Sequence, residues 1–234
     1  MENKERFLNI PIPMLKGLYE NSTKFFNDVF DVGIYLYSIT LEGAEVERYE
    51  GALKFLGITK ANISTAIKNA KSIISNLPDK YPVAGIDKDM LFNYYKNAKS
   101  EFELICLAAF LGIKSIIGKK PFDKTNKAMI HARMFGYVIP NDLPEDLTPL
   151  QKKYLLRWHM DKVITELQLN WNLKVFWNHN RGIYISFELP LEKLAAVIDK
   201  KGRKAKIQEL KEQKKRIREN LKNNSNLSKD EPTN

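Results

Sequence analysis

The sequence is almost without cysteine, since Cys106 is the only one among 234 residues. An intramolecular disulfide is therefore excluded, which favours a reducing compartment. No apolar run approaches the roughly 20 residues that a membrane-spanning helix needs. The first residues, MENKERFLNIPIPM, lack the basic and apolar regions of a secretion signal. We therefore expect a soluble, cytoplasmic protein with no membrane partner.

Histidine is also scarce, and the three that occur are scattered at His131, His159 and His179. None stands at metal-ligand spacing from Cys106 or a carboxylate, so the sequence predicts no metal site and no cofactor. Cys106 lies in an apolar segment, which is typical of a buried core residue. The stretch GIKSIIGKK fails as a phosphate-binding P-loop, because Lys120 stands where Ser or Thr is required. We expect neither an enzyme nor a small-molecule substrate.

Positive charge is what the chain has in excess, with 38 Lys and Arg against 28 Asp and Glu and a net charge of +10. Such a charge favours an anionic partner. Residues 199–222 hold eleven basic and four acidic residues, so residues 1–198 carry a net charge of only about +4. The basic segment is expected to form a helix that binds nucleic-acid backbone or a protein partner, or one that is merely solvated. Residues 223–234 are polar and predict a disordered tail.

Apolar periodicity predicts a mainly α-helical protein with one β-hairpin. We expect a helical domain over 1–82 and a second helical domain, which carries the hairpin, over 90–198. The segment LNIPIPM should be extended, because it alternates apolar residues with proline, and DKYPVAGIDKD should be a loop. The predicted helices span about 25–38 (capped by Ser22 or Thr23), 43–56, 59–77, 91–117, 127–135 (capped by Thr125), 150–171 and 191–221, and the predicted strands span 173–177 and 183–187.

The stretch KFLGITKANISTAIKNAK has the features of a helix, a sharp turn and a second helix. Gly57 permits the turn, because glycine adopts a positive φ at little cost. Thr59 offers a hydroxyl that can cap the second helix. The residues that can anchor that helix against the first are Ile58, Ile63 and Ile67. The side chains left on the other face are of types that contact bases or phosphates. These are Thr59, Lys60, Asn62, Ser64, Thr65 and Lys68.

This stretch resembles the helix-turn-helix of the phage repressor and Cro family, over residues 48–71. The resemblance rests on Leu56-Gly57-Ile58, then Ile63, then Ala66-Ile67. It departs from the family at Leu53, where a small alanine usually stands. The resemblance implies duplex DNA binding, with the second helix reading bases. The alternative is an ordinary pair of packed helices joined by a glycine turn.

A second candidate lies in residues 101–189, where three helices are expected before the hairpin. That order is similar to the winged-helix architecture, in which the third helix enters the major groove and the hairpin is the wing. Arg181, near the hairpin tip, could enter a minor groove or contact phosphate. The connector at 137–149 is longer than the usual turn. Two such units on one chain are similar to the tandem winged-helix initiators of mobile elements.

Lysines gather around the turn GKKPFDKTNK, which precedes a short predicted helix. A helix N-terminus with lysines nearby favours phosphate. The lysines that we assign to DNA binding are Lys119, Lys120, Lys124 and Lys127.

The sequence as a whole therefore predicts a protein that binds duplex DNA at a specific sequence. It would serve replication initiation or transcriptional regulation of a plasmid, phage or other mobile element, with a homodimer as one expected arrangement. The first-half stretch is the preferred base reader, and the second-half unit is the alternative. The competing hypothesis is a non-catalytic helical protein-interaction module whose basic tail binds nucleic acid without sequence preference.

Overall fold

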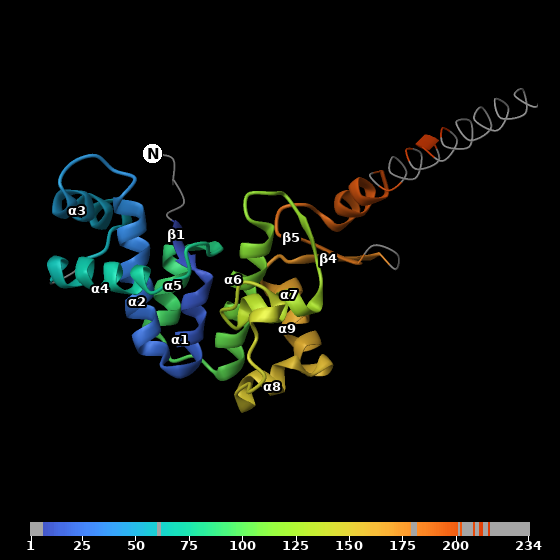
Figure 1. The fold of residues 1–234 in the computed structure, drawn as a ribbon, viewed down its shortest axis with the longest axis horizontal. Coiled ribbons are helices and arrows are strands. Elements are labelled where there is room, and N and C mark those ends of the chain that lie inside the picture. The colour runs from blue at the N-terminus through green and yellow to red at the C-terminus, as the bar shows by residue number, and fades with distance from the viewer. Residues whose placement is uncertain are drawn as a thin grey trace, which may run out of the picture. The chain divides into compact units, whose positions relative to one another are not determined.

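The computed structural model of the protein describes residues 7–59, 62–178 and 182–200, together with positions 202, 208, 211, 212 and 215. The described residues are mainly helical, with small antiparallel sheets, which confirms the predicted class at that level (Figure 1). None of their helices is long and apolar enough to cross a membrane. The chain divides into two compact units, Met1–Glu188 and Leu189–Asn234.

The first half of the larger unit is organised around one long helix, α2. This helix packs against β1, α1, α3 and α4. The strands β1 and β2 pair antiparallel, with Phe7 opposite Asp87 and Pro11 opposite Val83. In chain order the elements are β1 (Phe7–Pro11), the 3-10 helix η1 (Ile12–Met14), α1 (Leu15–Glu20), α2 (Ser22–Ser38), α3 (Glu45–Leu56), α4 (Ile63–Ser75), β2 (Val83–Asp87) and α5 (Lys88–Lys96).

The second half is organised around α6, which packs against α7 and α9 and also against β2 of the first half. Its three-stranded sheet has the order β3-β5-β4, so the last strand in the sequence lies in the middle. Both neighbours pair with β5 antiparallel. The elements are α6 (Glu101–Ile117), β3 (Asp123–Thr125), α7 (Lys127–Met134), the 3-10 helix η2 (Pro140–Asp142), α8 (Pro149–Leu155), α9 (Arg157–Asn170), β4 (Lys174–Asn178) and β5 (Gly182–Ser186).

Several predicted element boundaries are wrong. The expected loop at 79–89 contains β2, whose side chains alternate between exposed and buried. The helix expected over 150–171 is two helices, because the backbone of Leu156 is extended (φ −65°, ψ 133°). The helix expected over 91–117 is also two, α5 and α6, and Ser100 caps the second of them. Thr125 lies in β3 and is not a cap.

Two helices, α2 and α7, are capped by asparagine, although a serine or threonine cap was predicted for each. Asn21 caps α2 by accepting a hydrogen bond from the Lys24 backbone N–H, so neither Ser22 nor Thr23 does so. Asn126 caps α7 by accepting from the Met129 backbone N–H at 2.8 Å. Asparagine suits this position, because its short side chain reaches the free N–H groups of the first turn.

In the smaller unit, residues 191–200 are helical, as predicted for the start of the last helix. The five described positions beyond residue 200 are helical as well. The remainder of the predicted basic helix at 199–222 and the predicted tail at 223–234 lie outside the described residues.

The helix α6 has no solvent-facing side over its central turns, since every residue from Ile105 to Ile113 is buried. Gly112 lies where α7 approaches most closely. A Cβ atom on Gly112 would stand 2.8 Å from the Met134 backbone nitrogen and 3.1 Å from the Arg133 carbonyl carbon. Backbone atoms cannot move aside as a flexible side chain can, so this position requires glycine.

We therefore expect Gly112→Ala to destabilise the protein by about 1–3 kcal/mol, because the added methyl forces α6 and α7 apart. Urea denaturation at pH 7 measures the effect. Gly51→Ala is the matched control, because Gly51 lies in α3 and an added Cβ would stand 3.4 Å from Leu41 Cδ1. This control should stabilise the protein by about 0.5–1 kcal/mol, the usual gain for alanine over glycine within a helix. Equal effects of the two substitutions would contradict the close approach of α7.

Candidate nucleic-acid interface

The turn between α3 and α4 begins as predicted. Gly57 adopts a left-handed conformation (φ 64°, ψ 37°) directly after α3. The N–H of Ile58 donates to the Leu53 carbonyl at 3.0 Å, and the N–H of Gly57 donates to the Lys54 carbonyl at 3.2 Å. This pair of bonds is a Schellman motif, which satisfies the last carbonyls of the helix. The prediction of a glycine turn is confirmed.

The start of the second helix differs from the prediction. Helix α4 begins at Ile63, and its cap is Asn62, whose Oδ1 accepts from the Thr65 backbone N–H at 3.0 Å. The prediction that Thr59 caps the helix is therefore wrong, and Thr59 lies exposed in the turn. Helix α4 therefore begins later than the predicted start at residue 59. Lys60 lies outside the described residues.

The apolar side of α4 packs as predicted, with Ile67 buried and Ile58 and Ile63 partly buried against the core. Leu53, which stands where the repressor family has a small residue, is accommodated and buried. The opposite side of α4 is polar and exposed. It carries four of the residues predicted to contact DNA, which are Asn62, Ser64, Thr65 and Lys68.

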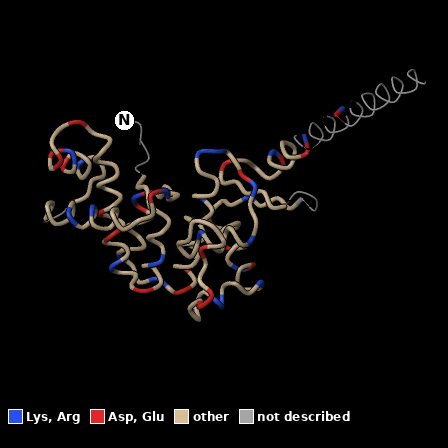
Figure 2. Tube along the Cα trace, viewed as in Figure 1, with Lys and Arg blue, Asp and Glu red and all other residues tan. Residues whose placement is uncertain are grey.

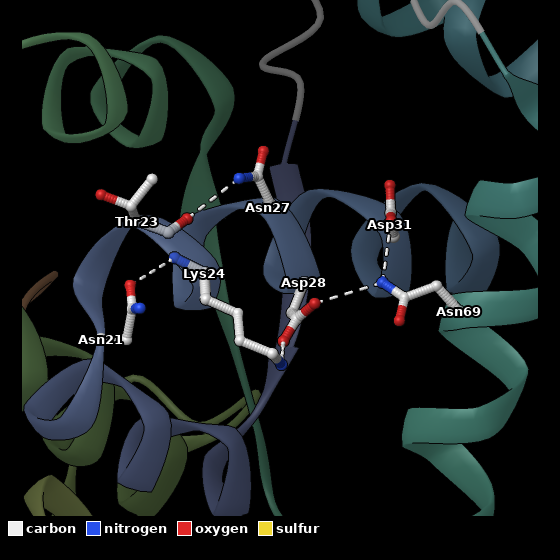
Figure 3. Close-up of polar contacts among 7 residues, drawn as sticks. All are labelled: Asn21, Thr23, Lys24, Asn27, Asp28, Asp31 and Asn69. Carbon is white, nitrogen blue, oxygen red and sulfur yellow. Dashed lines mark hydrogen bonds and ion pairs between the residues drawn. The ribbon is translucent and has the colours of Figure 1, made fainter.

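A hydrogen-bond network fixes α4 against α2 (Figure 3). The side-chain amide of Asn69 donates to Asp28 Oδ1 at 3.1 Å and to Asp31 Oδ2 at 2.9 Å. Lys24 Nζ donates to the other oxygen of Asp28 at 2.5 Å. Because Asp31 is buried, these bonds offset the cost of removing its carboxylate from water. Sequence reasoning missed Asn69, although two carboxylates three positions apart on an apolar helix are a signal that a polar partner packs there.

In the second half, Lys127 joins three elements. It is the first residue of α7, and its Nζ lies 3.9 Å from Asp161 Oδ1 on α9. The same Nζ lies 5.8 Å from the ring centroid of Trp177 on β4. The N-terminus of α7, the exposed side of α9 and the hairpin therefore meet on one surface. We call this the α9–hairpin surface and define it by Lys127, Trp158, Asp161, Lys162 and Trp177.

The other predicted lysines that the structure describes lie in the turn after α6 and on β3. Lys119 and Lys120 lie exposed in the turn after α6, and Lys120 pairs with Asp123 at 2.7 Å. Lys124 is exposed on β3, and its Cε lies 3.2 Å from where a Cβ on Gly182 would stand, so its side chain reaches the start of β5. Arg181 lies outside the described residues. Basic and acidic residues are mixed over the larger unit (Figure 2), so the hypothesis needs these particular lysines rather than a uniform basic face.

The described residues bear on two expectations from the sequence, one for a metal site and one for Cys106. They contain no group of three or more His, Cys, Asp or Glu that could hold a metal ion. Cys106 is buried, as predicted, and burial raises the pKa of its thiol to about 12, so the reactive thiolate does not form near neutral pH. Comparison of the chain with protein-family models, curated proteins and solved structures finds no match.

His131 on α7 is a buried histidine, and its Nε2 has no hydrogen-bond partner among the described residues. Burial lowers the pKa of this imidazole, and the positive charge of Lys127 lowers it further. Protonation therefore favours the unfolded chain, in which histidine has a pKa near 6.5. Stability is retained above that pH and is lost as the pH falls below it, because the unfolded state then takes up a proton that the folded state does not.

We expect the free energy of unfolding to fall less steeply between pH 7 and pH 5 in His131→Gln than in the natural protein. One histidine can change the slope by at most about 1.4 kcal/mol per pH unit. Urea titrations at several pH values measure the slope. His159→Gln is the matched control, since His159 lies against Trp158 at a partly exposed position and should flatten the slope less. Parallel curves for the natural protein and His131→Gln would contradict the buried neutral imidazole.

Because the Asn62 side chain caps α4, Asn62→Ala should destabilise the protein by about 0.5–2 kcal/mol. Asn62→Ser should keep the natural stability and the natural DNA preference, because a serine hydroxyl caps as well as an amide does. Denaturation and DNA titration of both variants measure this. Asn62→Ser could instead fold normally yet lose the sequence preference at one base pair. That result would show that Asn62 contacts a base through its Nδ2, in addition to capping the helix.

Proposed function

We propose that the protein binds duplex DNA at a preferred sequence, with α9 as the main reading helix and the β4–β5 hairpin as a wing. The observation that carries the proposal is the order of elements, α6–β3–α7–α8–α9–β4–β5, with the strand order β3-β5-β4. A winged helix likewise has its reading helix directly before the hairpin. In that architecture a strand that lies between the first two helices pairs with the hairpin, as β3 pairs with β5 here.

The exposed side of α9 supports this role. Its 14 residues extend about 21 Å at 1.5 Å per residue, enough to follow a major groove. Arg157, Lys162 and Thr165 are exposed on it, and side chains of these types contact base edges and phosphates. Recognition helices place their N-terminal residues at the bases, and Arg157 is the first residue of α9. The pair between Arg157 Nε and Asp161 Oδ2, at 3.4 Å, is an exposed one that DNA can replace at little cost.

The α3–α4 pair supplies a second contact in this proposal. Its polar face carries Ser64, Thr65 and Lys68, and the Asn69 network holds α4 rigidly enough to present them. The oxygen of Asn62 is already engaged by the Thr65 N–H, which argues against its use in a bidentate contact to adenine. We therefore assign α4 to phosphate contact. Two contact units on one chain fit replication initiation or transcriptional control of a plasmid, phage or other mobile element.

The test is selection from a random duplex pool at physiological salt, using the full chain and a chain that lacks residues 199–234. We expect both to select the same sequence, with lower overall affinity for the shortened chain, because the lost basic residues contact phosphate only. If the shortened chain binds nothing and the full chain shows no preferred sequence, the proposal is wrong. The protein is then an interaction module with a basic tail.

Two exposed lysines distinguish the roles of the helices on the selected site. Lys162→Ala on α9 should cost about 1–3 kcal/mol at the preferred site and relax the preference at one position. Lys68→Ala on α4 should weaken binding to preferred and random duplexes alike and reduce the salt slope by about one. Reversed behaviour of the two variants would assign base reading to α4.

A further inference from the structure

The indole rings of two tryptophans lie half in solvent on the α9–hairpin surface. Trp158 on α9 is 55% exposed and Trp177 on β4 is 56% exposed. Trp171, in contrast, is partly buried and packs with its ring centroid 4.9 Å from that of Phe110. The fold thus uses one tryptophan to pack its core and leaves two accessible. Tryptophan is highly buried on average, and it is enriched at surfaces that bind a partner.

The ammonium group of a lysine lies near each exposed indole ring. Lys162 Nζ lies 4.1 Å from the Trp158 ring centroid, and Lys127 Nζ lies 5.8 Å from that of Trp177. The two rings belong to one surface, because Lys127 also reaches Asp161, which follows Trp158 by one helical turn. The arrangement therefore repeats the same pair, an aromatic ring with an ammonium group over it, which a stacking base would displace toward the nucleic-acid backbone.

We propose that these two rings stack unpaired nucleotides, so that the α9–hairpin surface binds single-stranded as well as duplex DNA. This inference rests on the proposed function, because it assigns a second form of DNA to the same surface. Proteins that hold single strands combine aromatic rings, on which bases stack, with lysines that contact the backbone. An indole cannot stack on a base inside an intact duplex, since neighbouring bases already cover both of its faces.

Charge complementarity favours a nucleic acid over an uncharged partner on this surface. Asp161 lies within 4 Å of both Lys127 and Arg157, and Lys162 lies over the Trp158 ring, so three positive charges accompany one carboxylate. Lys124 adds a further positive charge beside the hairpin. The local excess of positive charge would repel a basic partner and attract a phosphate backbone. A strand that bridges the two rings would place its phosphates near these lysines.

The test uses the full chain and three probes at physiological salt. These are a 12-nucleotide single strand of mixed sequence, the selected duplex, and the same duplex with two unpaired nucleotides. Stacking quenches indole fluorescence, so we expect quenching with the single strand and the interrupted duplex and little with the intact duplex. Trp158→Ala and Trp177→Ala should each weaken single-strand binding about tenfold or more, and should weaken intact-duplex binding by a clearly smaller factor, because stacking contributes only to the single-strand complex.

Two controls keep the outcome clear. Trp171→Phe removes the partly buried indole and should leave the quenching unchanged, while Trp158→Phe should retain most single-strand affinity, because phenylalanine also stacks. Circular dichroism establishes that each variant is folded. The inference is overturned if the alanine variants bind the single strand as the natural protein does, or if they lose intact-duplex binding equally. Normal duplex binding with no single-strand binding removes the inference alone, whereas loss of preference for any duplex removes the proposed function.

Discussion

The structure depends on covering α6 on every side. A helix whose residues from Ile105 to Ile113 are all buried has no face left for water, so other elements must surround it. The helices α7 and α9 and the strands β2, β3 and β5 do so, and they come from both halves of the larger unit. The position of α9, on which the proposed reading of DNA depends, therefore follows from the burial of its neighbour. The absence of a side chain at Gly112 allows α7 to approach α6 closely.

Long periodic segments of this fold could be predicted from the sequence, and short paired ones could not. The helix that ends at Leu56 and the hairpin strands were found, because apolar spacing and a glycine turn are local signals. The strand β2 was missed, since its partner β1 lies more than seventy residues away and nothing local reveals the pairing. The break at Leu156 was missed as well, because neither glycine nor proline marks it.

The candidate site shows the same limit. Exposure of Ser64, Thr65 and Lys68 follows from the helical period, so the polar face of α4 could be predicted. The capping role of Asn62 could not be predicted. The helix was expected to begin at residue 59, which places Asn62 inside it, whereas α4 begins at Ile63 and Asn62 directly precedes it. The meeting of Lys127, Asp161 and Trp177 joins three elements through tertiary packing. The exposure of Trp158 and the partial burial of Trp171 against the core could not be predicted either, since both lie in the same apolar-rich segment.

The central place of β5 has a consequence for how the chain folds as it is synthesised. The strand β3 emerges from the ribosome about sixty residues before β5, yet β5 is its only hydrogen-bonded neighbour within the described sheet. The N–H and C=O groups of β3 therefore hydrogen-bond to water until α7, α8, α9, β4 and finally β5 have been synthesised. Because closing so long a loop is slow, the three-stranded sheet should form late, after the helices have already collapsed around α6.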